Sequence, residues 1–298
     1  MDSTPLADSQ SSRVDDGRTM FDGPIRDTLL RLGYLSEDQT ARVVSHQLER
    51  DLDFDQAALE LGFITTDDLD QAREQLITSL ALQDTRRRAV SEDLVVLSAP
   101  TGLRSEAIRL LRTQIIAQHI RSGRRGLAMV SAVDGAGCSY LVSNLAASLS
   151  QVGIKTLLID ANMRTPSIAG YFGLDNDGPG LSSFLSLQVS RPERVVNANV
   201  LPSLSVMTSG PAVARPQELL SGNRFRDGTN MLLREYDLVL FDTPPASANA
   251  DALTVGAAAG YALIVARRDH TYFSDISTLA NQLAAARCPV VGSVLNEF

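Results

Sequence analysis

Residues 131–140 read SAVDGAGCSY, and this stretch decides the fold of most of the chain. A Walker A phosphate-binding loop ends in glycine, lysine, and then serine or threonine. Gly135, Gly137 and Ser139 fit such a loop, but Cys138 stands where the lysine belongs. The stretch lies between an apolar run at 126–132 and a helical pattern at 138–153. Backbone amides at a strand-to-helix junction form an anion site, so the context predicts a phosphate cradle.

Short apolar runs alternate with helical stretches from about residue 99 onward. Runs at 155–160, 236–242, 260–266 and 289–296 predict further buried strands. Continuous apolar strands separated by helices predict a parallel sheet with helices on both faces. Ligands of such sheets bind beyond the carboxyl ends of the strands. Asp160 and Asp242 end two of the runs, where an aspartate can hold magnesium or its water.

Composition excludes several other classes of protein. No apolar run reaches the length that spans a membrane, and the acidic start of the chain is unlike a signal peptide. Residues 1–90 carry 18 acidic and 10 basic side chains, and the rest carries 17 of each, so no basic face for nucleic acid is indicated. Two distant cysteines, Cys138 and Cys288, suit a reducing cytoplasm. Lys155 is the single lysine of the sequence.

An internal repeat occupies the N-terminal part of the chain. Residues 27–44 align with 56–73 at an offset of 29, and the sequence LGYL in the first matches LGFI in the second. Each unit is typical of a helix that ends at glycine, a short link and a new helix. The new helices begin after Ser36 and Thr65, and Gln39 and Asp68 complete capping boxes. We therefore predict a small helical two-repeat module over residues 27–80.

The flanking segments have a different composition. Residues 1–22 are rich in Asp, Ser and Arg, which predicts a disordered leader. The charged run DTRRRAVSED places a linker over residues 81–98. The predicted P-loop α/β domain then occupies residues 99–298.

This second domain resembles the bacterial tyrosine kinases of capsule and exopolysaccharide synthesis, within the MinD/ParA-like P-loop group. The resemblance rests on SAVDGAGCS, LLIDANMRTP and YDLVLFDTPP in this order, and on EAIRLLR at 106–112, ARPQELLSG and GSVLN. The residues that it implies for nucleotide binding are Asp134, Gly135, Ala136, Gly137, Cys138, Ser139, Tyr140 and Arg164. The implied magnesium ligands are Ser139, Asp160 and Asp242, and both aspartates would be catalytic in an active enzyme. The implied oligomer interface consists of Glu106, Arg109 and Arg112.

Three departures from the family pattern affect residues that are expected to take part in phosphoryl transfer. Cys138 replaces the lysine that neutralises the phosphates, and such electrostatic groups contribute strongly to phosphoryl transfer. Asn162 stands where the family has a second aspartate after Asp160, and no tyrosine cluster is present in the sequence. Arg164, Arg124 and Arg125 are the candidate replacements for the lysine. Cys138 also starts a helix, where a thiol pKa can be lowered, so a redox sensor was a further hypothesis.

These features predict a cytoplasmic assembly and regulatory component of exopolysaccharide synthesis and export, held at the inner membrane through a partner. The resemblance implies a membrane-embedded chain-length determinant as that partner, a homo-oligomer, and ATP or ADP with magnesium as ligand. Kinase activity would be impaired or absent. One alternative is an active tyrosine autokinase. Another is a cyclic-dinucleotide-responsive adaptor, because residues 27–76 resemble the N-terminal domain of type II secretion and pilus ATPases. A surface-acting partitioning ATPase is a third.

Overall fold

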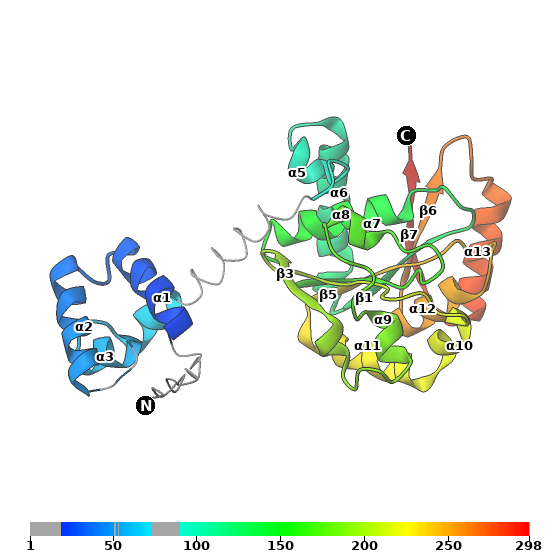
Figure 1. The fold of residues 1–298 in the computed structure, drawn as a ribbon. Helices are drawn as coiled ribbons and strands as arrows, with labels where there is room; N and C mark the ends of the chain where they lie inside the picture. The colour runs from blue at the N-terminus through cyan, green and yellow to red at the C-terminus, as the bar shows by residue number, and fades with distance from the viewer. Residues whose placement is uncertain (1–18, 51, 53, 73–89, 298) are drawn as a thin grey trace, which may run out of the picture. The chain divides into compact units, whose positions relative to one another are not determined.

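The computed structural model describes residues 19–50, 52, 54–72 and 90–297 (Figure 1). The chain divides into two compact units, Met1–Leu80 and Ala81–Phe298. Each unit has its own hydrophobic core among the described residues.

The first unit is entirely helical where it is described. It contains α1 (Thr19–Arg31), α2 (Glu37–Arg50), α3 (Phe54–Glu60) and a helical segment over 66–72. Gly33 and Gly62 follow α1 and α3 with φ of 75° and 66°, a left-handed conformation that favours glycine. The two predicted capping boxes form. The Ser36 amide donates to Gln39 Oε1 at 2.9 Å, and the Thr65 amide donates to Asp68 Oδ2 at 2.9 Å.

The offset of 29 residues also relates the buried side chains of this unit. Residues that the offset pairs are buried together: Ile25 with Phe54, Leu29 with Ala58, Leu35 with Ile64, Thr40 with Leu69, and Val43 with Ala72. The sequence repeat is therefore a structural repeat, whose two halves contribute to one core.

The start of α1 corrects one prediction. The helix begins at Thr19, so residues 19–22 are helical rather than part of a disordered leader. In the sequence, Phe21, Ile25 and Leu29 follow one another at intervals of four, which is helical spacing that the polar composition obscured. The rest of the predicted leader lies outside the described residues.

The second unit is built around a sheet of seven strands, and this confirms the predicted α/β class. The strand order is β3-β4-β2-β5-β1-β6-β7. The strands are β1 (Gly126–Ser131), β2 (Thr156–Asp160), β3 (Asn197–Leu201), β4 (Leu204–Met207), β5 (Leu238–Asp242), β6 (Ala262–Arg267) and β7 (Val290–Asn296). All neighbouring strands are parallel except β3 and β4, which form an antiparallel pair at one edge.

Helices cover both faces of the sheet (Figure 1). One face packs against α6 (Leu103–Gln118) and α7 (Cys138–Ser150), and the other against α11 (Asn223–Glu235), α12 (Asp251–Ala259) and α13 (Phe273–Ala285). Shorter helices are α5 (Val95–Ser98), α8 (Ile168–Tyr171), α9 (Leu181–Leu185) and α10 (Pro216–Ser221). Two 3₁₀ turns span Ile120–Ser122 and Pro192–Val195.

Part of the predicted linker belongs to this unit. Leu94 and Val96 are fully buried in its core, and the Ser91 amide donates to the Tyr171 carbonyl at 3.0 Å. Asn144 on α7 donates to the Asp93 carbonyl at 2.9 Å. The apolar run LVVL after the charged residues drives this packing, because four adjacent apolar side chains gain free energy by burial. Residues 81–89 of the predicted linker lie outside the described residues.

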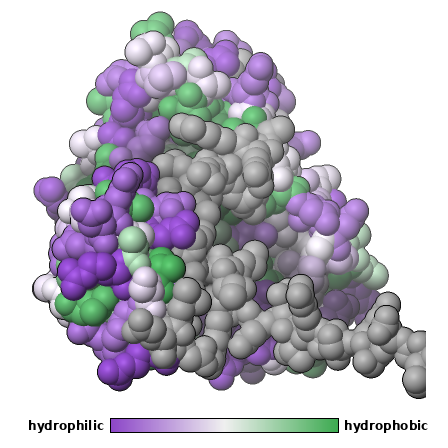
Figure 2. Space-filling model, turned by 60° about the vertical axis from the view of Figure 1, so that its left-hand side comes forward, coloured by the Kyte–Doolittle hydropathy of each residue, from purple (hydrophilic) through white to green (hydrophobic). Residues whose placement is uncertain are grey.

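The surface of the described residues has no long hydrophobic element. No helix among them is both long enough and apolar enough to cross a bilayer. On the face shown in Figure 2, hydrophobic residues form small separate patches among hydrophilic ones.

Candidate nucleotide site

The glycine-rich loop lies between β1 and α7, as the sequence predicted. Gly135 and Gly137 have φ of 70° and 86°, so both glycines adopt the left-handed conformation that a tight loop requires. The loop lines a cavity of about 560 Å³. The other residues that line this cavity are Asp93, Arg104, Ser131, Asp134, Ala136, Cys138, Ser139, Tyr140, Asn162, Tyr171, Thr243, Pro245 and Arg267. All predicted nucleotide-binding residues except Arg164 are among them.

Two carboxylates lie fully buried next to this cavity. Asp160 and Asp242 end β2 and β5, and they occupy paired positions in the register of these adjacent strands. Ser139 joins them to the loop, because its hydroxyl donates to Asp242 Oδ2 at 2.6 Å. Asp160 accepts hydrogen bonds from the amides of Asn162, Ser167 and Ile168, each at 3.1 Å. The three predicted metal ligands are therefore brought together.

The pair of carboxylates is electrostatically unfavourable without a cation. Burial raises the pKa of Asp160 to about 6, although three donating amides act in the opposite direction. Burial and then the charge of Asp160 raise the pKa of Asp242 well above its ordinary value. The second oxygen of Asp242, Oδ1, is buried and has no hydrogen-bond partner among the described residues. An unpaired carboxylate oxygen beside a hydroxyl and a second carboxylate matches the oxygen ligands that magnesium prefers.

The burial of the Cys138 thiol argues against the redox-sensor hypothesis. Cys138 is buried, and burial followed by the nearby charge of Asp242 raises the pKa of its thiol far above the ordinary value. Thiolates are the reactive form of cysteine, so this thiol is poorly suited to oxidation sensing. The helix N-terminus would favour the thiolate, but burial beside a carboxylate outweighs it.

Two further residues, the predicted Arg164 and the motif residue Asn162, form hydrogen bonds outside the cavity. Asn162 lines the cavity, but its Oδ1 accepts a hydrogen bond from the Thr165 amide at 3.2 Å, so this oxygen is used within its own loop. Arg164 does not reach the cavity. Its Nε donates to Asp251 Oδ2 at 2.8 Å. Asp251 begins α12 and is almost fully buried, and a buried carboxylate requires a cationic partner.

The arginines that reach the loop were not the ones expected from the sequence. Arg124 and Arg125 precede β1 and therefore lie at the opposite end of the strand from the loop. Arg267 instead donates from Nη1 to the Gly135 carbonyl at 3.2 Å, and His270 Nε2 lies 2.8 Å from the Asp134 carbonyl. Both belong to the sequence ARRDH at 266–270, at the end of β6. In the sequence, the sign of a role at the loop was the position of this segment at the end of an apolar run. The structure adds that β6 lies beside β1, which brings Arg267 and His270 to the loop.

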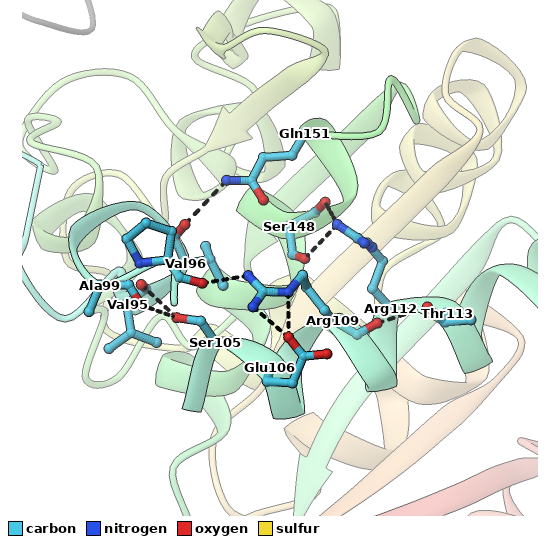
Figure 3. Close-up of polar contacts among 11 residues, drawn as sticks. Val95, Val96, Ala99, Ser105, Glu106, Arg109, Arg112, Thr113, Ser148 and Gln151 are labelled. Carbon is cyan, nitrogen blue, oxygen red and sulfur yellow. Dashed lines mark hydrogen bonds and ion pairs between the residues drawn. The ribbon is translucent and has the colours of Figure 1, made fainter. Parts of the chain in front are cut away.

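The predicted assembly helix is anchored to the domain in the way Figure 3 shows. Arg109 Nε donates to Glu106 Oε2 at 2.9 Å, and Arg109 Nη1 donates to the Pro100 carbonyl at 2.7 Å. Arg112 Nη1 donates to the carbonyl of Ser148 on α7 at 3.1 Å. Arg112 thus holds α6 on α7, whereas the Glu106 side chain remains 59% exposed.

Known proteins resemble this chain in sequence and in fold. The tyrosine-protein kinase YwqD of Bacillus subtilis is 33% identical over 217 residues, which is 73% of this chain and 91% of that protein. A putative tyrosine-protein kinase in the cps region of Klebsiella pneumoniae is 32% identical over 204 residues, or 68% of this chain and 28% of that protein. This chain therefore spans most of the shorter relative but under a third of the longer one. No family model matches.

Several solved structures have the same fold as the second unit of this chain. The kinase domain of the Escherichia coli tyrosine kinase ETK has a TM-score of 0.64 and 30% identity, with 68% of this chain and 79% of that chain covered. The chimerical protein CapA2B2 has a TM-score of 0.63 and 27% identity, with 74% and 98% covered. The cell division ATPase MinD of Pyrococcus furiosus, at 21% identity, shares the fold.

Proposed function

Because the chain belongs to the family of bacterial tyrosine kinases, we propose that it binds nucleotide to assemble and regulate a capsule or exopolysaccharide export system. In this proposal tyrosine phosphorylation is slow or absent. The observation that carries it is the combination of a complete loop, Ser139, Asp160 and Asp242 with Cys138 in place of the lysine. The groups that shape a phosphate and metal site are kept, whereas the lysine that stabilises phosphoryl transfer in the family is replaced.

The residues present fit a magnesium nucleotide. The Ser139 hydroxyl and the carboxylates of Asp160 and Asp242 would hold the metal, which would supply positive charge between the phosphate oxygens when bound. The described residues contain no cluster of three or more histidine, cysteine or acidic side chains that could hold a metal alone. This fits magnesium, which binds through one or two carboxylates together with phosphate oxygens and water.

Replacing Ser139 with alanine tests the metal and phosphate role directly. We expect the dissociation constant for ATP with magnesium, measured by calorimetry, to rise at least about tenfold, because a ligand to the metal is lost. Ser143→Ala, on the same helix, is the matched control, since the Ser143 hydroxyl is buried and has no partner among the described residues. Equal affinity in Ser139→Ala and the natural protein would contradict the site. No binding by the natural protein would contradict the nucleotide role.

An active tyrosine autokinase is the second candidate, and the intact carboxylate pair favours it. Asp160, with its pKa raised to about 6, can accept a proton near neutral pH more readily than an ordinary aspartate. This candidate requires phosphotyrosine after incubation with ATP and magnesium, and loss of that signal in Asp242→Asn. Absence of phosphotyrosine in a protein that binds ATP would leave the regulatory role as the better account.

Assembly is proposed to use the exposed side of α6, with a membrane-embedded chain-length determinant as the partner of the complex. Glu106 is the cleanest probe, because its side chain is exposed while Arg112 also holds α6 on α7. We expect Glu106→Ala to lower the mass of the oligomer in light scattering without changing the melting temperature. The exposed Gln118, at the far end of the same helix, gives the control Gln118→Ala. An unchanged mass in Glu106→Ala would exclude this surface.

A further inference from the structure

Three side chains from the ends of β6 and β7 hold the glycine-rich loop by its carbonyl groups. Arg267 donates to the Gly135 carbonyl, His270 Nε2 lies at hydrogen-bond distance from the Asp134 carbonyl, and Asn296 Nδ2 donates to the Ala136 carbonyl at 3.2 Å. Three consecutive carbonyls of the loop are thus fixed from one side.

Fixing these carbonyls also fixes the amides of the loop. In a planar trans peptide the C=O and N–H groups point in opposite directions. The carbonyls of Gly135 and Ala136 are held by β6 and β7, so the amides of Ala136 and Gly137 point away from these strands. The Gly135 amide is already used, because it donates to Asp134 Oδ1 at 2.9 Å. The loop is therefore preorganised by its neighbours, and no lysine is needed to shape it.

Arg267 also brings a charge to the cavity. It ends β6, the strand next to β1, is partly buried, and lines the same cavity as Cys138 and Ser139. The single lysine, Lys155, lies beside the Tyr236 ring and immediately before β2. It is therefore at the N-terminal end of the parallel strands, whereas the loop is at their C-terminal end. Arg104 lines the cavity too, but its side chain is exposed and interacts with the Tyr140 hydroxyl. Arg267 is therefore the cation best placed on the loop itself.

We propose that Arg267 supplies to the phosphates of a bound nucleoside di- or triphosphate part of the positive charge that a lysine at position 138 would otherwise supply. This inference rests on the proposed nucleotide binding. A guanidinium carries five N–H donors, and it keeps its positive charge while one of them donates to the Gly135 carbonyl. Arginine is well suited to phosphate because its planar fork can donate two parallel hydrogen bonds.

Titrations with ATP and magnesium in four variants test this assignment. Arg267→Gln keeps a donor for the Gly135 carbonyl but loses the charge, and we expect its dissociation constant to rise at least tenfold. Arg267→Lys keeps the charge and should retain most of the affinity. Arg268→Gln is the matched control, because Arg268 is exposed and donates to Glu297 Oε1 at 3.0 Å. The double variant Cys138→Lys with Arg267→Gln should recover the affinity that Arg267→Gln loses.

The outcomes separate the assignment from the proposed function. Binding by the natural protein with equal affinity in Arg267→Gln would overturn the role of Arg267 and leave nucleotide binding intact. Equal losses in Arg267→Gln and Arg267→Lys, with a lowered melting temperature before ligand is added, would mean that Arg267 only holds the loop, which also overturns the charge role. No binding by the natural protein would overturn both proposals.

Discussion

The variant Asp242→Asn is expected to melt at a higher temperature than the natural protein at pH 8 in the absence of magnesium and nucleotide. Asp242 is fully buried, its Oδ1 has no hydrogen-bond partner among the described residues, and Asp160 occupies the paired position on β2. A buried charge without a cation costs several kcal/mol, and asparagine removes the charge while keeping the shape. A gain of about 2 kcal/mol in the free energy of unfolding would raise the melting temperature by roughly 4–8 °C.

The direction of this change in stability follows from the pKa values of the two carboxylates. The pKa values of Asp160 and Asp242 are raised in the folded protein, to about 6 for Asp160, so the folded state binds protons more tightly than the unfolded state. Stability of the natural protein therefore falls as pH rises from about 4 through 6 and further as Asp242 loses its proton. The advantage of Asp242→Asn should therefore grow as pH rises and shrink towards pH 5.

Two controls make the measurement decisive. Magnesium should raise the melting temperature of the natural protein at pH 8, since a ligand of the folded state stabilises it, and should do so much less in Asp242→Asn. Asp227→Asn removes an exposed carboxylate from α11 and should show neither effect. A lower melting temperature for Asp242→Asn at pH 8 would show that the carboxylate is stabilised by something other than a metal.

Patterns that depend on neighbouring residues were predicted well. The capping boxes at Ser36 and Thr65 form because both partners lie within four residues of each other. The strands β1, β2, β5, β6 and β7 follow continuous apolar runs, which a parallel sheet buried on both faces requires. The β3–β4 pair was missed, because its strands are short and Ser203 joins them in a left-handed conformation, with φ of 60°, that is unusual for serine.

The residues of the candidate site can be grouped in the same way, into those that the sequence predicted and those that only the structure assigned. The loop and the two aspartates come from motifs at strand ends, and the structure brings them together. Arg267 and Asn296 could be assigned to the loop only once the strand order placed β6 beside β1 and β7 beside β6. Arg164 lies in a family motif, yet it pairs with Asp251, 87 residues further along the chain. Such a partner is a property of tertiary packing, and the sequence near Arg164 contains no sign of it.

Replacing Cys138 with lysine is the second change with a large expected effect. The side chain would begin α7 inside the cavity, beside the loop amides and close to the charge of Asp242. A charged hydrogen bond to phosphate contributes about 1.5–3 kcal/mol, so affinity for ATP with magnesium should rise roughly tenfold to a hundredfold in calorimetry. Transfer or hydrolysis of the terminal phosphate should rise by about 10²–10³, because the lysine would stabilise charge in the transition state.

The length and the charge of the new side chain have to be separated. Cys138→Met fills the same space without a charge, so it should leave affinity unchanged or lower it. A gain confined to Cys138→Lys would show that the cradle is intact and lacks only part of its charge, as expected if evolution kept the scaffold and relaxed the chemistry. Equal affinity and equal turnover in the natural protein and Cys138→Lys would mean that Arg267 or another group already supplies the full charge. If that shared turnover were fast, the slow-kinase part of the proposed function would be wrong.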